Sequence, residues 1–227
     1  MVKPVATRQT SGAWYRYWRL VSLDGSTLDV ADTEANVTAF GKPSGRRGPG
    51  GFPQVRFVSL VENGTHVLLA SEMDGYNRSE QVLGKRVIPH LSAGMLCLAD
   101  RLFSAYRLWE QASSTGADLL WRVGQMFALA PHQQLPDGSY LSHVYATSDD
   151  RRRGRNGILV RVIEYRLDGV ADADTQLPLN DYHRGSHPSS CRGISGCISR
   201  TLGDRNRTGR IKDTSARLQN HFAKQNA

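Results

Sequence analysis

The chain has 227 residues, of which 39% are hydrophobic and 22% charged, and its formal net charge is +8. This composition is that of a globular protein long enough to bury one sizeable core or two small ones. The opening residues MVKPVATRQT lack the apolar stretch of a signal peptide, and no run approaches the roughly 20 apolar residues of a membrane span. We therefore expect a cytoplasmic protein with no membrane partner.

The first half of the chain predicts strands around one flexible loop. Residues 1–13 have no regular pattern and are expected to form a loose leader. WYRYWRLVSL, residues 14–23, is aromatic and β-branched and predicts a strand that ends at Asp24. An irregular excursion follows, and residues 41–51 are too rich in glycine and proline for regular structure.

A hairpin and a helix are predicted next. Residues 53–62 and 65–73 read as two antiparallel strands joined across Asn-Gly, the strongest short hairpin signal. Ser79 is placed to cap a helix that ends before Pro89. GMLCLAD, residues 94–100, is apolar throughout, as in a strand buried on both faces.

The later elements alternate between strand and helix. Residues 104–116 suit an amphipathic helix with Gly116 past its end, and residues 117–123 suit a buried strand. Strands are also predicted at residues 140–147 and 158–167. The basic turn DDRRRGRNG between them reads first as a solvated loop, with contact to a phosphate backbone as the alternative.

The composition changes from residue 176 onward. Residues 176–227 contain no glutamate and only nine large apolar or aromatic residues, and they carry a net charge of +6, which leaves +2 for residues 1–175. Such a segment cannot bury enough apolar area to offset chain entropy. We expect it to be disordered, and the overall basic charge therefore says little about partners.

The cysteines do not predict a metal site. Cys97 lies in an apolar run and is most simply a small buried hydrophobe. Cys191 and Cys197 are separated by five residues, with no second pair nearby to complete a zinc site. A disulfide between them is not expected in the cytoplasm.

Two aspartates share one setting, because Asp24 follows RLVSL and Asp100 follows MLCLA. If both strands are central and adjacent, the two carboxylates meet although 76 positions separate them. Two such anions repel unless a divalent cation lies between them, and Mg²⁺ accepts these ligands. The alternative for each is a turn residue or a helix N-cap.

Four stretches resemble the DDE transposases of the insertion-sequence-4 type, in family order over about residues 12–170. They are LVSLDGSTLDVADTEAN, FGKPSGRRGPGGFPQVRFVSLVENGTH, MLCLADRLFSAYRLWEQASSTGADLLWRV and VRVIEYRLDG. The resemblance implies a ribonuclease-H-like mixed sheet with flanking helices and the start of a β-rich insertion, here over residues 14–175. It implies cutting and joining of DNA at transposon ends with Mg²⁺ or Mn²⁺, by a dimer or a higher assembly on DNA.

The resemblance also assigns residues. Asp24 in LDGST and Asp100 in LADR become the first two catalytic, metal-binding acids. Arg101 in LADR and Arg122 in WRV lie within the matching stretches and are expected to contact DNA. The exposed charge runs add Arg46, Arg47, Arg151, Arg152 and Arg153 as expected phosphate contacts. The chain departs from the family at Leu102, where glycine is usual and the turn beside Asp100 becomes crowded, and at Gly124, where a DNA-contacting lysine is usual.

The third acid of the family, a glutamate on a late helix, has no match, since the last glutamate is Glu164 in a predicted strand. Read one base out of register, the codons of residues 202–207 permit Trp-Glu-Ile-Glu-Thr, and those of residues 177–182 permit Tyr-Arg-Leu. We predict a frameshift near residues 174–176. The family's N-terminal DNA-binding region is also expected to be missing, and the product to have little or no activity.

Three other interpretations remain. A haloacid-dehalogenase-type phosphohydrolase is suggested by LDGST, but Ser22 stands where its nucleophilic aspartate is required. A transposase remnant that binds DNA without cutting it would use arginines such as Arg155, with an affinity that falls steeply with salt. The third interpretation is the product of a pseudogene with no role.

Overall fold

The computed structural model describes residues 2–45, 48–123, 129–165, 177–181 and 199–200. Up to residue 123 the helices and strands are, in chain order, β1 (Trp14–Tyr15), β2 (Trp18–Asp29), α1 (Glu34–Phe40), β3 (Ser44–Gly45), β4 (Gly48–Pro49), β5 (Gln54–Glu62), β6 (Val67–Gly75), α2 (Glu80–Val87), β7 (Met95–Ala99), α3 (Tyr106–Ser114) and β8 (Asp118–Val123). Two 3₁₀ turns, η1 (Ile88–His90) and η2 (Arg101–Phe103), follow α2 and β7. The remaining elements are β9 (Gln133–Gln134), β10 (Tyr140–Val144), α4 (Ser148–Arg153), β11 (Ile158–Tyr165), β12 (Leu177–Asp181) and β13 (Ser199–Arg200).

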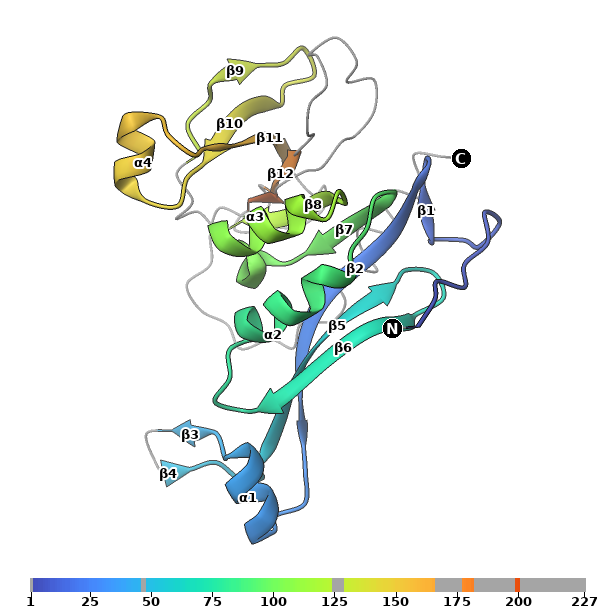
Figure 1. The fold of residues 1–227 in the computed structure, drawn as a ribbon, viewed down its shortest axis with the longest axis vertical. Coiled ribbons are helices and arrows are strands. Elements are labelled where there is room, and N and C mark those ends of the chain that lie inside the picture. The colour runs from blue at the N-terminus through green and yellow to red at the C-terminus, as the bar shows by residue number, and fades with distance from the viewer. Residues whose placement is uncertain (1, 46–47, 124–128, 166–176, 182–198, 201–227) are drawn as a thin grey trace.

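The main sheet is mixed, with the strand order β13-β8-β7-β2-β5-β6 and β1 paired to β2. β2, β7 and β8 are parallel neighbours. β5 runs antiparallel to β2 and forms an antiparallel hairpin with β6. Figure 1 shows α2 and α3 next to each other over one face of this sheet. The molecule is therefore of the α/β class, as the sequence predicts.

The second sheet is antiparallel throughout, in the order β12-β11-β10-β9. Together with α4 it lies at one end of the molecule in Figure 1, while α1 and the short β3–β4 pair lie at the other. Within the predicted disordered tail the structure describes only β12 and β13, so disorder stays a prediction for the rest. None of the described helices is long and apolar enough to cross a membrane.

The central strand β7 is buried on both faces. Cys97 packs in the larger core cluster with Val21 and the helix residue Trp109, whereas Leu96 and Leu98 belong to a second cluster on the other face. Alternate residues of a strand point to opposite faces, so a continuously apolar strand predicts two covered faces. The structure confirms this prediction for residues 95–99.

The expected loose leader is instead tied to the β5–β6 hairpin. The N–H groups of Val5 and Ala6 donate to Oε2 of Glu62 at 3.2 and 2.9 Å, and Val2 N–H donates to the Leu69 carbonyl at 3.0 Å. Glu62 is fully buried, and Arg19 pairs with its other carboxylate oxygen. No sequence pattern predicts this contact, because fully buried glutamates are rare.

Three further local expectations need correction. β2 does not end at Asp24 but continues alongside β5 to Asp29. The irregular excursion contains α1, which Thr33 caps by accepting a hydrogen bond from Asn36 N–H. The basic turn before β11 contains the short helix α4, capped by Thr147 and stopped by Gly154 in the left-handed conformation.

Candidate functional site

The two predicted acids lie at the carboxyl edge of neighbouring parallel strands. β2 and β7 pair in the register Leu23 with Ala99, and Asp24 and Asp100 are the next residue of each strand. β7 ends there and the chain turns into η2, while β2 continues with Asp24 opposite Ser59 of β5. The adjacency predicted from the sequence is confirmed, although only one of the two strands ends at its aspartate.

The carboxylates have different surroundings. Asp24 is exposed and accepts the N–H of Gly25 at 2.9 Å. Asp100 is half-buried and caps η2 by accepting the N–H of Leu102 at 2.8 Å. Asp100 is therefore an N-cap as well, so this alternative reading of the sequence is also correct. Leu102 is 50% exposed.

The pKa of Asp100 depends on its burial and on the charges around it. Burial raises the pKa of Asp100 above its ordinary value, and the negative charge of Asp24 adds to the rise. The hydrogen bond from Leu102 and the charges of Arg122 and Arg101 oppose it. An anion that raises the proton affinity of a neighbouring carboxylate makes a favourable place for a cation.

A third carboxylate, which sequence reasoning missed, approaches this edge from α2. Glu80 follows the cap residue Ser79, and a Cβ on Gly25 would lie 2.7 Å from the Glu80 carboxyl group. Burial raises the pKa of Glu80; the charge of Arg56 opposes the rise, and those of Asp100 and Asp24 add to it. Gly25, directly after Asp24, was the sequence signal that another side chain, here Glu80, comes close to the backbone at this point.

The donor chemistry fits a hard divalent cation but not a complete cage. Carboxylate oxygens are what Mg²⁺ prefers, and it is commonly held by one or two carboxylates together with water and substrate phosphates. Within the described ranges, no three His, Cys, Asp or Glu side chains are grouped closely enough to hold a metal ion. Asp24 and Asp100 thus fit as two ligands, with Glu80 as a nearby acid.

The arginines expected to contact DNA are not gathered in one place. Arg101 and Arg122 lie near Asp100, close enough for their charges to lower its pKa. Arg152 and Arg153 both pair with Asp149 on α4, at 2.6 and 3.0 Å, so their charge is partly neutralised within that helix. Arg151 and Arg155 are exposed there, while Arg46 and Arg47 lie outside the described residues, as do Gly124, Cys191 and Cys197.

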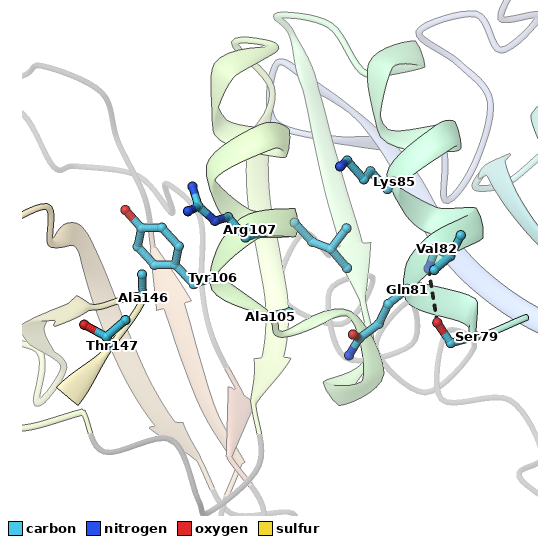
Figure 2. A pocket seen from close by; sticks show the side chains of 10 residues that line it. Ser79, Gln81, Val82, Lys85, Ala105, Tyr106, Arg107, Ala146 and Thr147 are labelled. Carbon is cyan, nitrogen blue, oxygen red and sulfur yellow. Dashed lines mark hydrogen bonds between the residues drawn. The ribbon is translucent and has the colours of Figure 1, made fainter. Parts of the chain in front are cut away.

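A groove of about 510 Å³ opens beside this site. Figure 2 shows it between α2, α3 and the loop that carries Ala146 and Thr147. Val82 and Leu108 provide apolar surface, and Lys85 provides a positive charge at the rim. None of the three acids lines it, so this groove is separate from the carboxylate site.

Comparison with known proteins gives one informative similarity. No protein-family model matches the chain. The transposase InsG for insertion sequence element IS4 of Escherichia coli K12 is 27% identical over 104 residues, which cover 46% of this chain and 24% of that transposase. The chain thus spans about a quarter of the length of the curated relative. Over that part, it is similar to a transposase of the IS4 kind.

Proposed function

We propose that the chain is the catalytic-core part of a DDE-type transposase that acts on the ends of an insertion sequence. The observation that carries this proposal is the β2–β7 register, in which Asp24 and Asp100 directly follow the last pair of two adjacent parallel strands. The similarity to an IS4 transposase supports the same reading independently of the geometry. A ribonuclease-H-like core is part of the proposal, with β5–β6 as its antiparallel hairpin and the second sheet as the start of the β-rich insertion.

The chemistry follows from the two carboxylates. Asp24 and Asp100 would hold Mg²⁺ or Mn²⁺, which when bound aligns the nucleophile and neutralises the charge that develops on the phosphate. A water or a 3′ hydroxyl then forms a new bond to phosphorus while the bond to the departing 3′ oxygen breaks. Arg101 and Arg122 lie where they would neutralise phosphate oxygens beside Asp100.

We further propose that this chain is a defective form, because residues 177–182 and 202–207 permit family-like sequence only when their codons are read one base out of register. Glu80 is too loosely placed to replace the family's late glutamate, since it completes no metal cluster with the two aspartates. When catalytic groups act as a unit, removal of one of them lowers the reaction rate by several orders of magnitude. The expected biochemical state is weak metal binding with little or no DNA cleavage.

The first experiment tests the metal site. Mn²⁺ is titrated into the full chain and followed by calorimetry or electron paramagnetic resonance. Asp24→Asn and Asp100→Asn are each expected to abolish the weak binding. Asp29→Asn, on the same strand but paired with Gln54, is the matched control and should leave binding unchanged. Equal binding by all four proteins would overturn the metal site.

The second experiment tests the defect. A version whose reading frame is shifted by one base after residue 174 is compared with the present chain on DNA that carries the sequences flanking the gene. Cleavage by the shifted version alone, with Mg²⁺, is the expected result. Cleavage by the present chain would contradict the proposed inactivity. Cleavage by neither would overturn the transposase reading of this locus.

A further inference from the structure

Two histidine rings meet on the second sheet, outside the carboxylate site. The imidazoles of His132 and His143 lie with their ring centroids 5.4 Å apart and their planes at 72°. His143 belongs to β10, and His132 directly precedes β9. The N–H of His132 donates to the Leu141 carbonyl at 2.7 Å, which holds the two backbone segments together. The pair is therefore fixed by sheet hydrogen bonds.

Both rings are available to a ligand. His132 is exposed and His143 half-buried, and within the described residues neither imidazole has a hydrogen-bond or ion-pair partner; their contacts are with each other and with the Tyr145 ring. Burial lowers the pKa of His143, and the neighbouring His132 lowers it further. Neutral imidazole is the form that binds metals.

The ring spacing matches a shared metal ion. Zinc binds imidazole nitrogen at about 2.0–2.1 Å, which for a tetrahedral angle places two ring centroids about 5.2 Å apart. The observed separation of 5.4 Å is close to that value. We propose that His132 and His143 form a two-imidazole chelate for a borderline divalent cation, Zn²⁺ foremost.

This site differs in chemistry from the carboxylate edge. Imidazole nitrogen selects zinc, nickel or copper, whereas carboxylate oxygen selects magnesium or manganese. No third His, Cys, Asp or Glu joins the pair in the described part of the chain, so water completes the coordination. A bound Zn²⁺ would link the segment before β9 to β10. The proposal does not depend on the proposed transposase function.

The test uses the full chain with Mg²⁺ in excess, so that the carboxylate edge is already supplied with its preferred ion. Zn²⁺ is titrated in competition with a metal indicator into the unaltered protein, His132→Gln, His143→Gln and the double variant. Each single variant is expected to bind about a hundredfold more weakly, because the second ring binds an ion already held by the first. The double variant should be little weaker than either single one.

His66→Asn is the matched control. His66 is an exposed, separate histidine with a φ of 58°, a conformation that asparagine tolerates. This variant should retain full Zn²⁺ affinity. Other histidines and cysteines are common to all the proteins, so the difference between variants is the measurement. An affinity unchanged in either single variant would overturn the chelate, as would the same Zn²⁺-induced rise in melting temperature in all of them.

Discussion

Leu23 and Ala99 form the last pair of the parallel ladder between β2 and β7, and an aspartate follows each of them. Beyond this pair β7 turns into η2, while β2 keeps its pairing with β5. Two carboxylates therefore lie at one edge of the sheet, and the negative charge of Asp24 helps to raise the pKa of Asp100. Their mutual repulsion has consequences that can be measured without any DNA.

Asp100→Asn should stabilise the folded protein. The substitution removes a charge that Asp24 repels, and asparagine caps the following turn about as well as aspartate does. Like charges at neighbouring strand positions destabilise by about 0.2–1 kcal/mol, so a gain of that size is expected in urea unfolding at pH 7. Asp74→Asn, which loses ion pairs to Arg78 and Arg86, should give no gain. A lower free energy of unfolding for Asp100→Asn would contradict a destabilising repulsion between Asp24 and Asp100.

Glu62→Ala should destabilise strongly. The change leaves Arg19 and the amides of Val5 and Ala6 without their shared acceptor in a buried place. Breaking one side of a buried ion pair costs about 3 kcal/mol or more. Glu72→Ala, which removes an exposed ion pair to Arg86, is the control and should cost less than about 1 kcal/mol in the same unfolding measurement.

Acid should weaken the fold through two carboxyl groups. Burial raises the pKa of Glu62, but hydrogen bonds from Thr65, Ala6 and Val5 and the charge of Arg19 outweigh it, and the pKa lies below its ordinary 4.5. Asp137 likewise falls below 3.8, because hydrogen bonds from Ser139 and the charge of Arg161 outweigh its desolvation. The folded protein then binds fewer protons than the unfolded chain, so their contribution is present above the ordinary pKa values and is lost as pH falls through the lowered ones.

The measurement is the free energy of unfolding between about pH 6 and pH 3. Glu62→Gln cannot titrate at this position, so its stability should fall less steeply with acid than that of the unaltered protein. Parallel curves for the two proteins would show that Glu62 does not carry the acid sensitivity.

Gly64→Ala should be more harmful than Gly138→Ala. Both glycines have a positive φ, of 83° and 84°, so the backbone strain of the substitution is the same. A Cβ at Gly64 would lie 2.4 Å from the Ser11 carbonyl oxygen, whereas nothing lies within 4 Å at Gly138. We expect an additional loss of about 1–3 kcal/mol at Gly64, measured by urea unfolding. Equal losses would show that the leader moves away freely.

Cys97 should resist alkylation in the folded protein. Burial raises the pKa of its thiol to about 12, so almost no thiolate exists at pH 8. Mass spectrometry after iodoacetamide treatment should find the Cys97 peptide unlabelled in buffer and labelled in urea. Labelling at equal rates in both would mean that β7 opens easily.

Sequence patterns predicted the elements that have a strong local signal. β7 and β8 were predictable because a short, continuously apolar segment is typical of a strand buried on both faces. The β5–β6 hairpin was predictable because Asn-Gly between two strand-like segments favours a hairpin turn. The α2 cap at Ser79 was equally clear. Pairing between β2 and β7, however, was only a conditional expectation, since sequence alone does not fix which strands are neighbours.

The missed features depend on contacts between distant segments. β2 passes Asp24 because β5 offers a pairing partner as far as Gln54, which no local signal in residues 25–29 reveals. Glu80 reaches the acidic edge from a separate helix, and His132 meets His143 through the β9–β10 pairing. Each of these features is a tertiary contact between distant segments, and the periodicity of a single segment does not predict such contacts.

The buried Glu62 also bears on where this protein can be shortened. A boundary drawn before Trp14, where the strand pattern begins, would delete both amide donors and leave the Glu62 carboxylate with Arg19 and Thr65 as partners. The loss of these two hydrogen bonds would destabilise the end of β5, which pairs directly with the strand that bears Asp24. Removing the residues before Trp14 would thus destabilise the strand pair that carries Asp24, although the deleted segment does not contact that aspartate in any hydrogen bond described above.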